Sequence, residues 1–264
     1  MKKSFPVELV YQVFSLLIAF ILVHALYVTV IRPQANSFLE QEAANMQADP
    51  DYVQQRSFFV VIKDYEQETY FVLMLWAFSI LGFKGKTTYS QQKLLEQDLL
   101  RLPEDLPIGA EDTRDLASRL RSLPAVAQEY LLPRALLTAI ERFGATRNVQ
   151  DVSTAARDIC ESEGERMESE LSIIRYIAWA IPSVGFIGTV RGIGDALGQA
   201  HRAVEGDITG VTSSLGVAFN STFIALVISI VLMFFIHQLQ LMQERLALDS
   251  ERYIDHWFIR RLQT

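Results

Sequence analysis

Two long apolar segments near the C-terminus, each with one threonine at its middle, constrain this chain more than any other feature. Thr189 lies in the first segment and Thr222 in the second. Each segment is long enough to cross a bilayer, which takes a helix of about 20 residues. A polar group at that depth usually joins helices or serves a function. The pattern therefore predicts a helical membrane protein with a hydroxyl at the centre of two spans.

The two hydroxyls are predicted to lie at the same depth. A turn near residues 201–210 separates the segments, and each threonine lies about 11 residues from it. At about 1.5 Å of rise per residue, both lie about 16 Å below the same membrane surface. Each hydroxyl can bond to the carbonyl four residues before it, which is ordinary helix packing. Two hydroxyls at one level also suit an ion path, and both interpretations stay open.

Small residues surround each threonine. At about 100° per residue, one face of each segment carries mostly glycine, alanine and hydroxyl side chains. Such faces let another helix approach closely. The predicted packing and pore faces comprise Pro182, Gly185, Gly188, Gly192, Ala218 and Ala225. The candidate ion-path residues are Thr189, Thr222, Ser221 and Ser229.

The two segments resemble a known family of membrane proteins. The stretch 182–195 resembles the second transmembrane helix of TolQ and ExbB, whose pattern is P-x-x-G-L-x-G-T-V-x-G-I. The stretch 215–229 resembles their third, with A-L-x-x-T-x-x-G-L. The wider family is MotA/TolQ/ExbB, the larger subunit of ion-driven motors in bacterial inner membranes. By analogy, Thr189 and Thr222 are the pore hydroxyls of that family.

Two positions depart from the TolQ and ExbB pattern. Arg191 stands where those proteins usually carry an aromatic or other neutral residue. Val217 stands where they usually carry a glutamate, five residues before the threonine. The missing carboxylate weakens an assignment to the TolQ and ExbB branch. MotA-type subunits also lack it, so the motor-subunit interpretation holds.

The resemblance implies particular partners. Family members form a homopentamer around a dimer of a MotB/TolR/ExbD-like single-span protein, which brings a transmembrane aspartate. The implied transported ion is the proton, and sodium stays open because Ser221 and Thr222 put two hydroxyls side by side. The process that such a motor would drive is not indicated. The alternative function is a non-conducting multi-span membrane scaffold, which would use the same small faces for packing alone.

Composition limits the other classes of function. Half of the 264 residues are hydrophobic, and the mean hydropathy of +0.18 suits several spans and a soluble part. A net charge of −7 argues against nucleic acid as a partner. Cys160 is the single cysteine, so no intramolecular disulfide forms. We find no P-loop, zinc-ligand spacing or nucleophile motif, and we expect no enzyme activity, no metal and no cofactor.

The predicted fold class is an all-α integral membrane protein with four spans, two of which extend as long helices into the cytoplasm. Lysine and arginine gather in 84–175 and in both termini, which places these parts in the cytoplasm of an inner-membrane protein. The first span is predicted to be an uncleaved anchor. In chain order, the predicted parts are a cytoplasmic N-terminus and first span (1–31), a periplasmic segment (32–68), a second span (69–83), a helical cytoplasmic domain (84–175), a third span (176–200), a periplasmic turn (201–210), a fourth span (211–236) and a cytoplasmic C-terminal helix (237–264).

Charged residues carry two further predictions. Arg191 lies about 13 Å deep, and Asp195 follows one turn later on the same face, which favours a structural intramembrane pair between them. The alternative is an arginine that biases ion entry. Glutamates at 161, 163, 165, 168 and 170 favour a solvated helix face, and the alternative is a face that binds a partner. His24 is expected to pack rather than relay protons.

Overall fold

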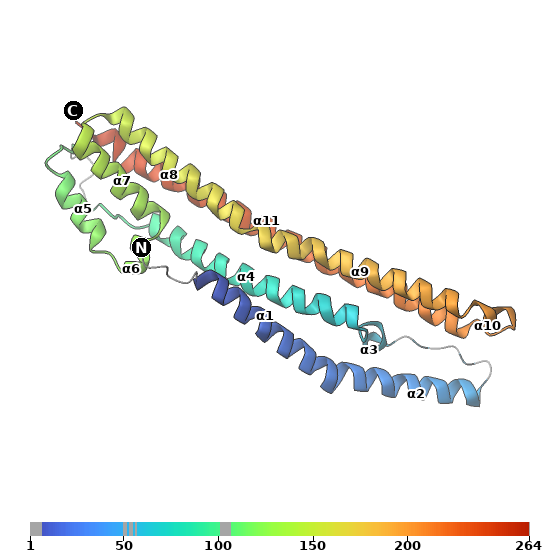
Figure 1. Cartoon of the computed structure of the whole chain (residues 1–264). Helices are drawn as coiled ribbons and strands as arrows, with labels where there is room; N and C mark the ends of the chain where they lie inside the picture. The colour runs from blue at the N-terminus through green and yellow to red at the C-terminus, as the bar shows by residue number, and fades with distance from the viewer. Residues whose placement is uncertain (1–6, 50–51, 53–54, 56, 101–106, 264) are drawn as a thin grey trace. The chain divides into compact units, whose positions relative to one another are not determined.

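The computed structural model describes residues 7–49, 52, 55, 57–100 and 107–263 (Figure 1). Parts of the predicted cytoplasmic N-terminus (1–6), periplasmic segment (50–51, 53–54 and 56) and cytoplasmic domain (101–106) lie outside these residues. The chain divides into two compact units. The first comprises Met1–Leu81 and Ile173–Ile236, and the second comprises Gly82–Ser172 and His237–Thr264.

The described residues are almost entirely helical, which confirms the all-α class. Their only extended pairing is an isolated bridge between Ile108 and Leu262. In chain order, the elements are α1 Val7–Leu26, η1 Tyr27–Ile31, α2 Arg32–Ala48, α3 Phe58–Val61, α4 Tyr65–Leu95, α5 Thr113–Arg121, α6 Ala125–Gln128, α7 Leu131–Thr146, α8 Val149–Glu170, α9 Ser172–Gly198, α10 Ala200–Val204, α11 Thr209–Trp257 and η2 Ile259–Arg261.

Three helical stretches of the described chain are long and apolar enough to cross a membrane: Glu8–Ala48, Val149–Gly198 and Thr209–Arg261. They contain the predicted first, third and fourth spans. The predicted second span, 69–83, lies within α4 and is not among them. Although α4 has 31 residues, its apolar part is bounded by Glu68 and Lys84. That part is shorter than the roughly 20 residues that a span needs, so the second span stays a prediction.

α1, η1 and α2 form one continuous N-terminal helix. Its one irregularity is a π-helical turn, which does not break the helix. This turn, η1, ends two residues before Pro33, and the backbone N–H of Arg32 bonds to the carbonyl of Tyr27 five residues earlier. Proline has no N–H to give to the carbonyl four residues before it. The π-helix occurs mostly as such single turns inside α-helices.

α1 packs against α4 within the first unit. The Tyr11 hydroxyl lies 2.8 Å from Oγ of Ser79, and Nε1 of Trp76 donates to the Gln12 carbonyl at 2.9 Å. The outer face of α1 is apolar and open, with Phe14 at 61% and Ile21 at 62% exposure. A soluble protein would bury such side chains, so this surface suits lipid.

The second unit has its own core. It is built by α5, α7, α8 and the last turns of α11, with Leu136, Ile140 and Phe143 fully buried. Asn148 begins α8 by accepting a hydrogen bond from the backbone of Gln150, as a helix cap does. The hydroxyl of Tyr253 on α11 ties this core to the chain after α4, because it accepts from the Leu99 backbone at 3.0 Å.

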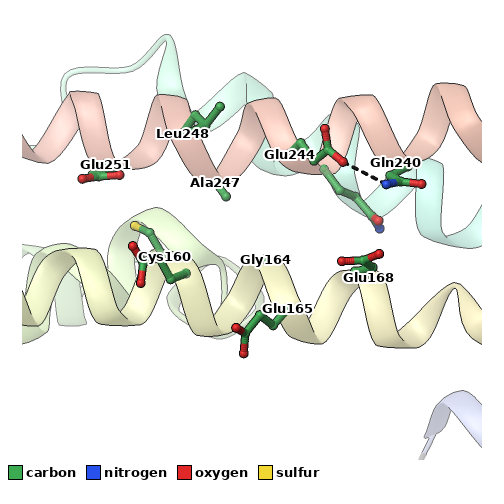
Figure 2. Close-up of a pocket in the computed structure, with 11 residues that line it drawn as sticks. Cys160, Gly164, Glu165, Glu168, Gln240, Glu244, Ala247, Leu248 and Glu251 are labelled. Carbon is green, nitrogen blue, oxygen red and sulfur yellow. Dashed lines mark hydrogen bonds between the residues drawn. The ribbon is translucent and has the colours of Figure 1, made fainter.

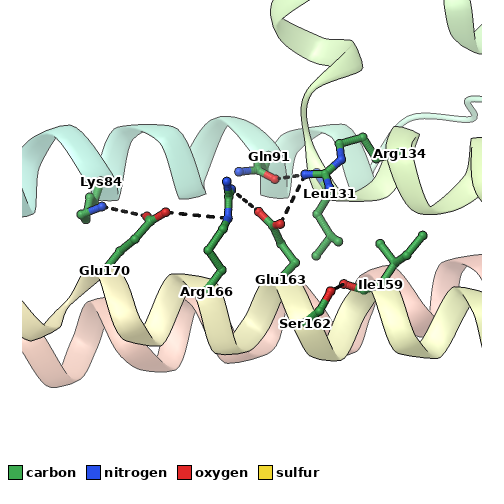
Figure 3. Close-up of polar contacts among 9 residues, drawn as sticks. All are labelled: Lys84, Gln91, Leu131, Arg134, Ile159, Ser162, Glu163, Arg166 and Glu170. Carbon is green, nitrogen blue, oxygen red and sulfur yellow. Dashed lines mark hydrogen bonds and ion pairs between the residues drawn. The ribbon is translucent and has the colours of Figure 1, made fainter. Parts of the chain in front are cut away.

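The prediction of a fully solvated acidic face on α8 is wrong at Glu163, which is buried. It is 6% exposed and takes hydrogen bonds from Arg134 of α7, at 3.3 Å, and from Arg166 (Figure 3). Glu170 accepts from the buried Lys84 of α4 at 2.8 Å. Glu163 falls on the stripe that also contains Val152, Ala156, Cys160 and Met167. It is therefore carried to the core side and needs cationic partners there.

Candidate ion-path site

α9 and α11 approach closely where their small residues meet. A Cβ added at Gly185 would lie 2.5 Å from Cβ of Ala225, and one added at Gly192 would lie 2.8 Å from Cβ of Ala218. Gly188 leaves room for the side chain of Ser221. Glycine is thus required at the contact because no side chain fits between the two backbones. The residues predicted to form packing faces lie at this contact, with Pro182 inside α9.

A methyl group at the contact should separate the two helices. We expect Gly185→Ala to destabilise the pair by about 1–3 kcal/mol, the usual cost of overpacking. Gly194→Ala is the matched control, since a Cβ there meets nothing within 4 Å. Thermal unfolding of the purified protein in detergent would compare the two. Equal stability of both variants would contradict the close approach.

The structure brings the two threonine hydroxyls together between α9 and α11. Oγ1 of Thr189 contacts Oγ1 of Thr222 directly. Thr189 also lies 3.0 Å from the Ala218 carbonyl of α11, and Thr222 lies 3.1 Å from the Gly185 carbonyl of α9. The equal depth expected from the sequence is therefore present. Both side chains are half-buried, so neither is sealed within the helix pair.

The other candidate hydroxyls occupy different positions. Ser229 donates to the Ala178 carbonyl of α9 at 2.9 Å, which joins the same two helices further along. Ser221 is 1% exposed, and its Oγ has no hydrogen-bond partner among the described residues. The hydroxyl of Tyr70 on α4 donates to the Ser221 carbonyl at 3.4 Å. The side chain of Ser221 thus lies against Gly188 of α9, and its backbone carbonyl faces α4.

The predicted pair between Arg191 and Asp195 is wrong in the structure. Arg191 forms two contacts of 2.8 Å with the carboxylate of Glu66, at the start of α4. Asp195 is exposed and forms no ion pair among the described residues. A guanidinium can reach a neighbouring helix and bind both oxygens of a carboxylate, which an intrahelical partner one turn away rarely allows.

Two carboxylates on α4 with basic partners were not predicted from the sequence. Glu66 has 12% of its side chain exposed, and its Cγ lies 3.3 Å from the Cβ position of Gly188, next to Thr189. Glu68, two residues on, is buried and binds Arg32 and Nδ1 of His24, the latter at 2.6 Å. The sequence feature that could have indicated these carboxylates is the acidic run directly before the apolar part of α4. That run falls at the end of the predicted periplasmic segment, 32–68.

Comparison with known proteins agrees with this geometry. Residues 128–252 match the family described as the MotA/TolQ/ExbB proton channel family. Over this part, the chain is similar to that family. No curated protein and no solved structure matches the chain. The family domain contains Thr189, Thr222 and Arg191, whereas Glu66 and Glu68 lie outside it. The resemblance drawn from the two apolar segments is confirmed.

The hydroxyl pair has a chemistry suited to moving protons. Each hydroxyl carries one hydrogen and accepts through two lone pairs. The two hydrogens can be shared among the Ala218 carbonyl, the Gly185 carbonyl and the partner hydroxyl. More than one bonding pattern therefore satisfies the pair, and the choice can change without breaking the helix contact.

Proposed function

We propose that this chain is the pore-forming subunit of an inner-membrane, ion-driven motor complex. The observation that carries the proposal is the paired, half-buried hydroxyls of Thr189 and Thr222 inside a proton channel family domain. In such a complex, a single-span partner would bring a transmembrane aspartate to the hydroxyls. One charge crossing 100 mV supplies about 2.3 kcal/mol, enough to bias a rotary step of a few kcal/mol.

The proposed topology has four spans with both termini in the cytoplasm. α4 supplies the second span, and the ion pairs of Glu66 and Glu68 reduce the cost of placing its acidic start near the membrane. The second unit is then the cytoplasmic domain, which agrees with the excess of lysine and arginine in 84–175. The proton is the proposed ion, and sodium stays open.

The proposed assembly is a homopentamer around a dimer of the single-span partner. We expect the chain, co-expressed with a single-span protein that carries a membrane-embedded aspartate, to purify as one complex of that composition. Native mass measurement in mild detergent tests this. A clean monomer that keeps its helical content and binds no partner would contradict it.

A non-conducting membrane scaffold is the second candidate function. It is favoured by one observation: both hydroxyls already bond to carbonyls of the opposite helix. In that case the threonines serve only to join α9 and α11. The two functions separate when the hydroxyls are removed, because packing tolerates valine and an ion path does not.

A further inference from the structure

A groove between α8 and α11 in the second unit has the properties of a ligand site. It encloses about 410 Å³, within the range of small-molecule pockets. Five glutamates line it, at 161, 165, 168, 244 and 251, and no lysine or arginine does. Its remaining lining includes Cys160, Gly164, Gln243 and Ala247.

A buried amide points to a missing hydrogen-bond donor in this groove. Gln243 lines the groove, is 5% exposed, and its Oε1 accepts no hydrogen bond among the described residues. Leaving a buried acceptor unpaired costs about 1–3 kcal/mol. A ligand with an N–H group would satisfy this oxygen, whereas an anion would face both the amide oxygen and the glutamates.

Glu165 lies beside the middle of the groove, and the other labelled glutamates lie toward its two ends (Figure 2). Gly164 and Ala247 meet at its middle, where a Cβ added at the glycine would lie 3.8 Å from Cβ of Ala247. Glu251 and Cys160 lie to one side of this waist, and Glu168 and Glu244 lie to the other. Positions seven apart on a helix are separated by about 10 Å, which sets the distance between the two acidic ends.

The negative charges that line the groove affect the pKa of its cysteine. Burial, which is the largest cause, and the neighbouring charges of Glu251 and Glu161 together raise the pKa of the Cys160 thiol to about 12. Part of the potential is already balanced, because Glu251 lies 3.4 Å from Arg157 and Glu244 accepts from Gln240 at 2.9 Å. Glu161 forms no ion pair among the described residues, so one carboxylate at that end has no cationic partner beyond the Arg157 that binds Glu251.

We propose that this groove binds a linear polyamine. The ammonium groups at its ends would lie beside the two sets of glutamates. Its methylene segments would cross the waist, and the central ammonium of a triamine would lie near Glu165, which also lines the groove. An extended triamine has about the required distance between its terminal ammonium groups. A partner helix suits the groove less well because the waist is where α8 and α11 touch. A single divalent cation suits it less well because the carboxylates of the described residues form no cluster that could hold a metal.

Calorimetry with spermidine and the full-length protein in detergent tests this site. We expect saturable binding at physiological ionic strength, with one triamine for each chain. Putrescine, a shorter diamine, should bind more weakly because it reaches only one end. The Glu161→Gln, Glu244→Gln double variant should weaken spermidine binding about tenfold or more, since each end loses a charge-assisted contact. Glu129→Gln, an exposed site outside the groove, is the matched control and should bind as the wild type.

Four results would overturn the proposal. They are an absence of saturable spermidine binding, unchanged affinity in the double variant, displacement of spermidine by Mg²⁺ at matched ionic strength, and tighter binding of a lysine-rich helical peptide than of spermidine. Circular dichroism of the double variant would establish that it is folded before binding is compared. None of these measurements depends on ion conduction, so the site and the proposed function fail separately.

Discussion

Replacing Thr189 and Thr222 together with valine is expected to abolish ion-driven work while the complex still assembles. Valine keeps the shape of threonine and removes the hydroxyl. The interhelical hydrogen bonds lost in this change are worth about 0.6 kcal/mol each in a membrane, which is too little to separate α9 from α11. The process that the motor drives in cells would be scored beside the amount of assembled complex.

Serine at the same positions distinguishes an ion path from packing. Thr→Ser keeps the donor and acceptor and removes a methyl group, so partial activity should remain. Packing alone predicts the reverse order, with valine tolerated and serine loosening the contact. An active double-valine variant would favour the scaffold function.

Removing the guanidinium of Arg191 should have the second largest effect, through Glu66. Arg191→Ala leaves a carboxylate that is 12% exposed without its partner. Because the arginine itself is 44% exposed, the cost should lie below the roughly 3 kcal/mol of a fully buried pair. Assembly should therefore fall before conduction is affected. Glu66→Gln in the same chain should restore much of it, because the unpaired charge is then gone.

Asp195→Asn is the matched control for this pair. Asp195 is exposed and forms no ion pair among the described residues, so its neutral variant should assemble as the wild type. The yield of oligomer from native gels would rank the three variants against the wild type. If Asp195→Asn reduces assembly and Glu66→Gln does not restore it, the partner of Arg191 is not Glu66. If the double variant assembles but its ion selectivity changes, Arg191 also acts on ion entry.

The geometry of the hydroxyl pair could be predicted because it depends on regular helices alone. A constant rise per residue places Thr189 and Thr222 at one level once the turn between them is known. The spacing of glycine and alanine likewise indicates which faces meet. The close contact between α9 and α11 agrees with both expectations.

The partner of Arg191 could not be predicted in the same way. The spacing of residues along one helix can indicate only partners on that same helix, such as Asp195. The actual partner belongs to α4, and its register against α9 is set by packing between segments that are far apart in the sequence. The burial of Glu163 differs, since its place on the apolar stripe of α8 was visible in the sequence. The glutamates around it made the whole run resemble a solvated face.

Ion flux through the reconstituted complex tests conduction most directly. The chain and its single-span partner would be placed in liposomes with a pH-sensitive dye inside, and a potassium gradient would set the membrane potential. We predict proton uptake by the wild-type complex that follows the potential, and uptake at the level of empty liposomes for the Thr189→Val, Thr222→Val variant. Equal uptake by both complexes would contradict a path through the two hydroxyls.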